Sequence, residues 1–193
     1  MKDYIKLGMT LLLICAIAAG ALAFMNSMTA PVIAENNRIA SNAIYIDIYG
    51  DAADDYIEIT PEELESIKAN HPGVEKVLVA TKGGEAVGYV FHVTSNGFGG
   101  AMSNVIIFNN DGSIAGYRNL TNAESPGFGN VIADEPFYSK FDGKSIASGD
   151  LVLGAGGGAN EIEAISGSTV TSRAVLSGLN EAVAVFKEMY FNK

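Results

Sequence analysis

The sequence contains very few of the side chains that build metal centres and disulfides. It has one cysteine, Cys15, and two histidines, His71 and His92, among 193 residues. A single cysteine forms no internal disulfide, and it excludes a cysteine-based zinc site or an iron–sulfur cluster held by cysteines. Two isolated histidines give no basis for a Ser-His-Asp or Cys-His arrangement. We therefore predict neither a metal site nor catalytic residues in this chain.

Positive charge is also scarce. The chain has 12 Lys and Arg against 22 Asp and Glu, which gives a formal charge of −10. Phosphate backbones are bound by clustered cations, so this balance excludes a nucleic acid as a partner. The hydrophobic share of 48% excludes fibrous and disordered classes.

The hydrophobic residues are concentrated near the N-terminus. No charged side chain occurs in the 28 residues from Leu7 to Ala34, and a helix of about 20 apolar residues crosses a bilayer. The alternative is a cleaved signal peptide, with Lys2 and Lys6 as its basic region and Ala21-Leu22-Ala23 as its cleavage site. The apolar run is longer than in most signal peptides, so we expect a retained transmembrane helix.

The charges on either side of this span predict its orientation. Lys2 and Lys6 precede it, whereas the residues beyond position 34 include 10 basic and 21 acidic side chains, a formal charge of −11. Cytoplasmic flanks carry the excess of Lys and Arg. We therefore expect a single-pass protein of the cell membrane, with a cytoplasmic N-terminus and the rest of the chain on the extracytoplasmic side.

The remainder of the chain predicts an α+β domain. We expect the first helix to continue to about Tyr45, an acidic loop that includes Asp51, Asp54 and Asp55, and a second helix that Thr60 caps and that ends near Asn70. Alternating apolar residues and hairpin signals then predict an antiparallel sheet, with strands over 74–82, 85–94, 102–108 and 113–120. A short strand at Val152-Leu153 and a helix over 171–190 complete this prediction.

The predicted organisation has three parts. Residues 1–34 form a cytoplasmic tip and the transmembrane helix, residues 35–73 a helical connector, and residues 74–193 a domain with an antiparallel sheet and flanking helices. The glycine-rich segment 154–159 nearly matches a dinucleotide-binding fingerprint. No helix follows it at once, and too little chain remains for a βαβ unit, so we interpret this segment as a loop.

Two segments of the domain are candidates for a binding site. Glu124–Gly129 is rich in glycine and proline and ends a predicted strand, and Glu163–Ser172 is dense in hydroxyl groups where a loop enters the last helix. The N–H groups and the dipole at a helix N-terminus favour an anion such as a phosphate. Serine and threonine are also ordinary helix caps, so the spacing leaves both interpretations open.

The second segment resembles the flavinylation motif of the FMN-binding subunits of two related membrane complexes, the Rnf complex (a ferredoxin:NAD oxidoreductase) and the sodium-translocating NADH:quinone reductase. In that family an Asp-Gly/Ala-x-Ser/Thr-Gly-Ala-Thr pattern is followed by x-Thr-Ser, and the threonine of the Ser-Gly-Ala-Thr core carries FMN through a phosphoester bond. The resemblance implies that Thr169 carries FMN covalently.

The resemblance covers nearly the whole chain. It includes Asn26–Pro31 with Ala34–Asn36, the loop Gly97–Gly100, the segment Glu124–Gly129, which is similar to the family's Glu-Thr-Pro-Gly-Leu-Gly, and Phe141–Lys144. In these segments and in its short length, the chain resembles the G subunit of Rnf.

Four positions depart from the family pattern. Glu163 replaces Asp, Ser168 replaces Ala, Ser125 replaces Thr and Phe128 replaces Leu. Ser168 adds a hydroxyl beside Thr169, so the esterified residue is open between these two.

The resemblance also implies which residues surround the flavin. Phe98 and Phe128 lie among glycines and are candidates to contact the isoalloxazine ring, with core packing as the alternative. Besides Thr169, the predicted cofactor-binding residues are Phe98, Glu124, Ser125, Pro126, Gly127, Phe128, Gly129, Ser166, Gly167, Ser168, Val170, Thr171 and Ser172.

The implied function is an electron relay between ferredoxin and NAD, coupled to Na⁺ or H⁺ translocation. Its implied partners are the other membrane subunits of the complex and a separate flavin transferase, with no direct site for ferredoxin or NAD. One alternative is the FMN subunit of a sodium-translocating NADH:quinone reductase. The other is a non-redox, membrane-anchored binding module in which Thr169 only caps a helix.

Overall fold

The computed structural model describes residues 2–191 and, among these, every side chain except those of residues 2, 3, 34–42 and 148. The predicted flanking cation Lys2 and the family segment Ala34–Asn36 therefore lie outside the described side chains. The chain divides into two compact units, residues 1–44 and 45–193.

The long first helix, α1 (Lys2–Tyr49), confirms the predicted helical N-terminal region and passes through Pro31 without a break. Its segment Tyr4–Ile33 has a mean hydropathy of 2.4 and is long and apolar enough to cross a membrane. None of its described side chains is buried within the unit. This apolar surface is suited to a lipid environment.

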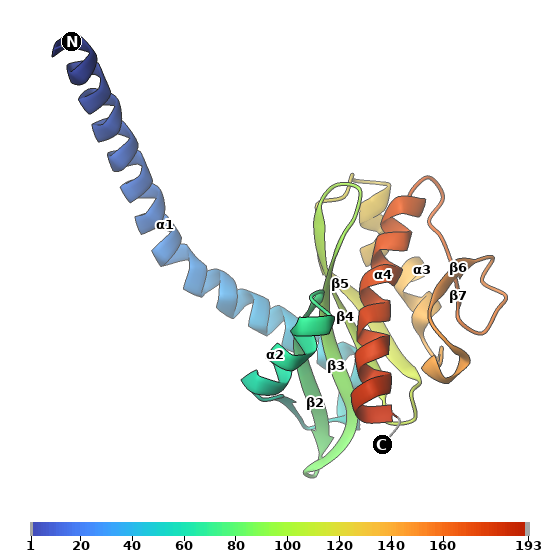
Figure 1. Cartoon of the computed structure of the whole chain (residues 1–193). Helices are drawn as coiled ribbons and strands as arrows, with labels where there is room; N and C mark the ends of the chain where they lie inside the picture. Colours follow the sequence, from blue (N-terminus) through green and yellow to red (C-terminus); the bar gives the residue numbers. More distant parts are fainter. Residues whose placement is uncertain (1, 192–193) are drawn as a thin grey trace. The chain divides into compact units, whose positions relative to one another are not determined.

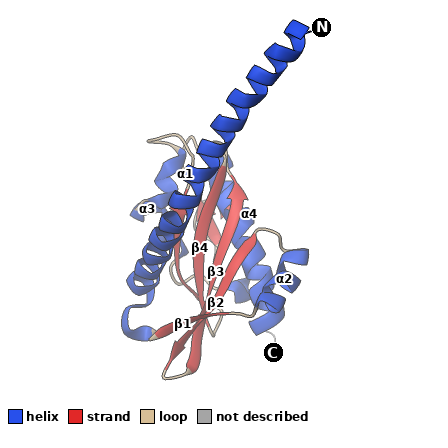
Figure 2. Ribbon diagram, turned by 90° about the vertical axis from the view of Figure 1, so that its left-hand side faces the viewer, coloured by secondary structure: helices blue, strands red, loops and turns tan. Residues whose placement is uncertain are grey.

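A five-stranded antiparallel sheet forms the centre of the second unit (Figures 1 and 2). Its strands follow the order of the chain and are β1 (Asp55–Glu58), β2 (Val74–Lys82), β3 (Glu85–Asn96), β4 (Ala101–Asn109) and β5 (Ile114–Thr121). The β2–β3 turn is the predicted glycine pair, in which Gly83 has φ +60° and Gly84 has φ +87°. Such angles are those of hairpin turns and cost a glycine little. The predicted α+β class and antiparallel sheet are confirmed.

The edge strand β1 corrects one sequence prediction. The sequence predicts a solvated loop at Asp55, but this residue begins a strand in which Asp55 pairs with Thr81 and Glu58 pairs with Leu78. The carboxylate of Asp54 also accepts a hydrogen bond from the N–H of Gly83 at 3.0 Å. Backbone pairing to an existing strand overrides the low strand propensity of aspartate.

Two helices cover one face of the sheet (Figure 2). The first, α2 (Pro61–Asn70), begins at the predicted capping box, in which Thr60 and Glu63 exchange hydrogen bonds. The second, α4 (Thr169–Phe186), continues as a π-helical turn to Phe191. It starts two residues before the predicted Thr171, so Thr169 lies in its first turn. Its buried side chains join those of the sheet in one core, which includes Phe91, Phe108, Leu179, Val183 and Phe186.

The last turn of α1 packs on the opposite face. The hydroxyl of Tyr45 hydrogen-bonds Nε2 of His92, and the hydroxyl of Tyr49 donates to Oδ1 of Asn109 at 2.9 Å. Asp47 pairs with Arg118 at 2.8 Å. These contacts fix the end of α1 to β3, β4 and β5.

A compact connection joins β5 to α4. It contains the short elements η2 (Gly129–Ala133), α3 (Glu135–Tyr138), η3 (Ser139–Phe141), η4 (Ile146–Ser148), β6 (Val152–Gly154) and β7 (Glu161–Glu163). The predicted strand at Val152-Leu153 is confirmed as part of β6. Its parallel partner β7 was not predicted. Phe137 and Phe141 pack against Tyr117 and attach this connection to the sheet.

Candidate functional site

A cavity of about 410 Å³ lies where three loop segments meet at one end of the sheet. The segments are the β3–β4 loop, the loop between β5 and η2, and the start of α4. The cavity is lined by Phe98, Glu124, Ser125, Phe128, Gly129, Gly167, Ser168, Thr169, Val170 and Thr171. All ten are predicted site residues, so the fold brings together segments that lie about 70 positions apart in the sequence.

The start of α4 is held by its own backbone and by Ser172. Gly167 has φ +77°, a left-handed conformation that glycine adopts easily, and it turns the chain into the helix. The buried hydroxyl of Ser172 accepts the N–H of Ile165 at 3.0 Å and donates to the carbonyl of Ser168 at 3.1 Å. Ser172 therefore fixes the shape of this segment from beneath and does not line the cavity.

The two adjacent hydroxyl residues differ in accessibility. Ser168, at the cap position of α4, is only 7% exposed, whereas Thr169 is exposed. Thr171 faces inward and is 2% exposed. A group attached to Thr169 would meet solvent and the cavity, while a group on Ser168 or Thr171 would displace packed atoms.

Glu124 connects all three segments. Its buried carboxylate accepts a hydrogen bond from the N–H of Gly99 at 3.0 Å through Oε1, and one from the hydroxyl of Thr171 at 2.8 Å through Oε2. Both oxygens are thus engaged by the protein. A carboxylate that accepts two such bonds positions the loops on either side of the cavity.

Two glycines make room for this carboxylate. A Cβ atom at Gly97 would overlap Oε1 of Glu124, and one at Gly129 would overlap Oε2. Close approach explains why both neighbouring loops carry glycine. Gly97 and Gly99 were not among the predicted site residues, although their loop belongs to the family resemblance.

The rim of the cavity is apolar. Phe98 is 77% exposed, Phe128 is 61% exposed and Val170 is 58% exposed. The alternative prediction of core packing for the two phenylalanines is therefore wrong. Exposed aromatic side chains beside a cavity suit the packing of a flat aromatic ligand.

Four predicted residues do not line the cavity. Pro126, Gly127 and Ser166 are exposed beside it, and Ser172 is buried behind it. Within the described side chains, no cluster of three or more His, Cys, Asp and Glu is placed to hold a metal ion.

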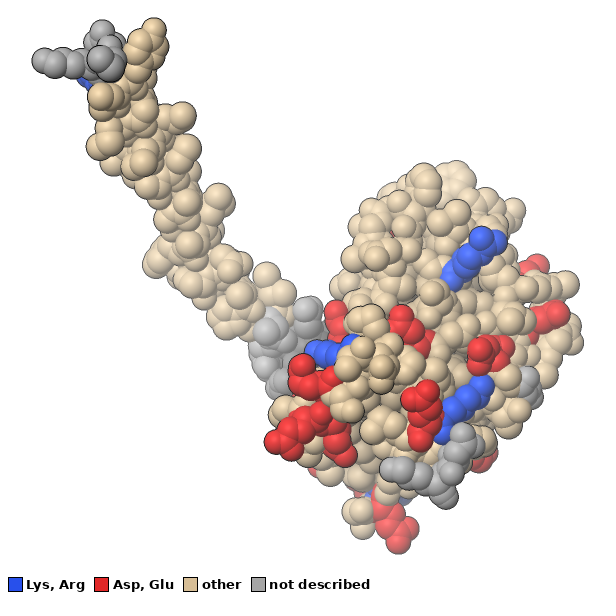
Figure 3. All heavy atoms as spheres, in the orientation of Figure 1, with Lys and Arg blue, Asp and Glu red and all other residues tan. Residues whose placement is uncertain are grey.

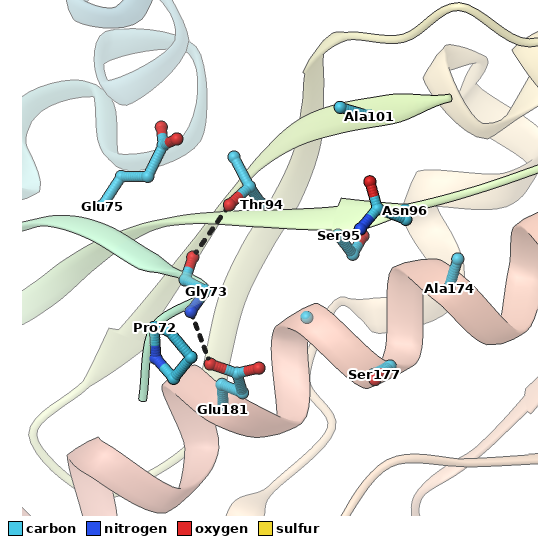
Figure 4. A pocket seen from close by; sticks show the side chains of 11 residues that line it. Pro72, Gly73, Glu75, Thr94, Ser95, Asn96, Ala101, Ala174, Ser177 and Glu181 are labelled. Carbon is cyan, nitrogen blue, oxygen red and sulfur yellow. Dashed lines mark hydrogen bonds between the residues drawn. The ribbon is translucent and has the colours of Figure 1, made fainter. Parts of the chain in front are cut away.

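A larger cavity of about 630 Å³ lies between the start of β2, the end of β3 and α4 (Figure 4). None of the predicted site residues lines it. The carboxylate of Glu181 there accepts the N–H of Gly73 at 2.8 Å, so this acidic group already has a structural role.

The smaller cavity lies within a segment that matches a known family. Residues 97–184 match the FMN-binding domain, and residues 1–47 match the RnfG N-terminal region. The first match contains every predicted site residue.

Similar proteins share this organisation along their length. The chain is 35% identical to the G subunit of the Na(+)-translocating ferredoxin:NAD(+) oxidoreductase complex of Acetobacterium woodii, over 97% of this chain and 94% of the relative. It is 31% identical to the G subunit of the proton-translocating ferredoxin:NAD(+) oxidoreductase complex of Clostridium ljungdahlii, over 58% of this chain and 60% of that one.

A solved structure has the same fold. It is the C subunit of the Na(+)-translocating NADH-quinone reductase of Parabacteroides distasonis, with a TM-score of 0.54 and 23% identity over 70% of this chain and 77% of that chain. This likeness concerns the fold alone. The identity to the full-length relative from Acetobacterium woodii and the two matched family segments agree, and the chain therefore belongs to the family of G subunits of ion-translocating ferredoxin:NAD(+) oxidoreductase complexes.

Proposed function

We propose that this chain relays electrons within a membrane complex that couples ferredoxin:NAD oxidoreduction to ion translocation, and that it carries FMN covalently on Thr169. The observation that carries this proposal is the position of Thr169. Its exposed side chain lies in the first turn of α4 at the edge of a cavity, inside the segment that matches the FMN-binding domain. The volume of about 410 Å³ is within the range of roughly 300–1,000 Å³ that is common for cofactor sites.

The attachment uses chemistry that Thr169 can supply. The oxygen Oγ1 of Thr169 would form a bond to the flavin-side phosphorus of a flavin–nucleoside dinucleotide, the bond from that phosphorus to the bridging oxygen would break, a nucleoside monophosphate would leave, and the hydroxyl proton would go to a base of the transferase. The ester keeps one negative charge, which the N–H groups at the start of α4 stabilise. Retention then no longer depends on affinity, although residues 35–193 carry a formal charge of −11.

The rim and the floor of the cavity have separate roles in this proposal. Phe98 and Phe128, which come from two different loops, would pack against the isoalloxazine ring. Glu124 holds these loops in place through Gly99 and Thr171. The bound flavin supplies transfer of one or two electrons, and the protein orients it.

The names of the similar subunits support a multi-subunit complex, and the flavin transferase is part of this proposal. The chain assembles with the other membrane subunits of the complex, and a separate flavin transferase modifies it. We infer from the flanking charges of the apolar segment that the N-terminus is cytoplasmic and that the FMN site lies on the extracytoplasmic side. A membrane-impermeant protease should then degrade residues 45–193 in intact spheroplasts. Cleavage only after lysis would contradict this orientation.

Two matched variants test the attachment. Thr169→Val keeps the shape of the side chain but removes the hydroxyl, so the full chain should fold, insert and lose all covalent flavin. Ser168→Ala restores the family residue and should keep the flavin. In-gel flavin fluorescence after denaturation and the intact mass measure the covalently bound flavin in both variants. If Thr169→Val retained the flavin fluorescence and Ser168→Ala lost it, the attachment site would be Ser168 instead of Thr169. A wild-type chain that never carries flavin would favour the binding module without redox function.

A further inference from the structure

The solvent-facing side of α4 carries one basic residue next to Thr169. In the first three turns of this helix, Thr169, Val170, Arg173 and Ser177 are exposed, whereas the other described side chains are buried. Thr169, Arg173 and Ser177 follow one another at four-residue spacing and therefore share a face of the helix. The Cβ atoms of residues four apart lie about 5–6 Å from each other. Helical side chains also lean toward the N-terminus, which directs Arg173 toward Thr169.

Arg173 forms no ion pair or hydrogen bond with the described residues. Most basic side chains of residues 45–191 contact a carboxylate or a backbone carbonyl. These side chains are Lys76, Lys82, Arg118, Lys140, Lys144 and Lys187. Within the described part of this unit, Lys68 on α2 is the other cation that forms neither an ion pair nor a hydrogen bond. A guanidinium without a partner, in a unit with a large excess of carboxylates, is available for a ligand.

We propose that Arg173 binds the phosphate of the flavin attached to Thr169. The inference rests on the proposed attachment and adds a residue that neither the family resemblance nor the cavity lining includes. A guanidinium presents paired N–H donors that match phosphate oxygens, and it keeps its charge at every physiological pH. With Oγ1 of Thr169 on one side and Arg173 one turn away, the phosphate is fixed on the outer face of α4.

The negative charge of the surrounding unit would repel a phosphate, and Arg173 counters this repulsion. Acidic side chains gather on the part of the unit away from the start of α4, and they are sparse toward that end on the face shown in Figure 3. The excess negative charge of the unit still repels a phosphate at distances shorter than the Debye length of about 8 Å. Arg173 offsets this repulsion locally. Because the pair is exposed, its contribution is modest and salt-sensitive.

The test compares the gain in thermal stability that the flavin provides. Wild type, Arg173→Gln, Arg173→Lys and the control Lys68→Gln are prepared as full chains in detergent, each with and without co-expressed flavin transferase. Intact mass gives the loaded fraction, and the unfolding midpoint is measured at low and high salt. Flavin attachment should raise the midpoint of wild type and Lys68→Gln equally. At low salt the rise for Arg173→Gln should be smaller than that for wild type by on the order of 2 °C. The rise for Arg173→Lys should lie between those of wild type and Arg173→Gln.

High salt should remove the difference between Arg173→Gln and wild type. An equal rise for loaded Arg173→Gln and wild type at low salt would overturn the role of Arg173 and leave the attachment to Thr169 standing. Arg173→Gln that stays unloaded while Lys68→Gln loads fully would assign Arg173 to recognition by the transferase, which also overturns the proposal. A wild-type chain that acquires no flavin would instead reject the attachment itself.

Discussion

Glu124 has a different role in the structure from the one that its place in a loop indicates. A glutamate between a strand and a Pro-Gly turn is usually solvated, but this side chain is only 8% exposed and joins Gly99 to Thr171. Two hydrogen bonds to a buried carboxylate are stronger than those between neutral groups. The cavity therefore depends on one acidic residue that does not need to react.

Replacing this carboxylate should destabilise the fold in a graded way. Glu124→Ala leaves the N–H of Gly99 and the hydroxyl of Thr171 without their acceptor, so we expect a loss of about 2–3 kcal/mol in the free energy of unfolding. Glu124→Gln retains one oxygen for Gly99, and its amide can donate to Thr171, so the loss should be clearly smaller. Urea unfolding of the full chain in detergent measures both. Equal stability of wild type and Glu124→Ala would show that the two hydrogen bonds contribute nothing.

The end of α1 and strand β3 form the most distinctive contact between elements in the second unit. His92 lies under Tyr45, and burial, with a smaller effect of Lys76, lowers the pKa of His92 from 6.5 to about 4. The unfolded chain therefore binds a proton between these two pH values and the folded chain does not. Stability rises with pH wherever the unfolded state binds more protons.

The stability of the protein should accordingly fall as the pH decreases from about 6.5 toward 4. Between pH 7.5 and pH 5 the loss from His92 should be about 2 kcal/mol. His92→Gln stays neutral at every pH, so it should show a flatter dependence over this range, in which few carboxylates titrate. Thermal unfolding of both chains at several pH values measures the difference. Parallel profiles would mean that His92 keeps an ordinary pKa in the folded state.

The sequence predicts those elements whose signals are local. The capping box at Thr60 and Glu63, the Gly83-Gly84 turn and strand β2 were all predictable because each depends on neighbouring residues. Strands β1 and β7 were not, because they have only four and three residues and acquire their conformation by pairing with another strand. The site followed the same rule. The motif around Thr169 is evident in the sequence, whereas the link from Glu124 to Gly99 and the solvent-facing position of Arg173 depend on the folded chain.

At the level of the whole chain, the boundary between the two units has a testable consequence. The second compact unit starts at Tyr45. The sequence instead predicts that the domain with the FMN site starts at Val74, and this boundary remains a prediction. A chain of residues 45–193 keeps β1, α2 and the contacts of Tyr45 and Tyr49 with the sheet. A chain of residues 74–193 loses all of them and exposes the outer edge of β2.

We expect the chain of residues 45–193 to be soluble without detergent and to unfold cooperatively, because its core is complete without the apolar helix. The chain of residues 74–193 should unfold at a clearly lower temperature or aggregate through its open strand edge. Calorimetry and light scattering of the two purified chains measure this. Equal midpoints would show that residues 45–73 are only a connector.

Fragment mass spectrometry tests most directly whether FMN is esterified to Thr169. Trypsin releases a peptide that ends at Arg173, and fragmentation of the peptide between Ser168 and Thr169 separates the two hydroxyls. We predict that the mass of FMN, less one water, stays with every fragment that contains Thr169 and is missing from fragments that end at Ser168. The mass of FMN on a fragment that ends at Ser168 would contradict esterification at Thr169. An unmodified peptide from chains made with the transferase would contradict it as well.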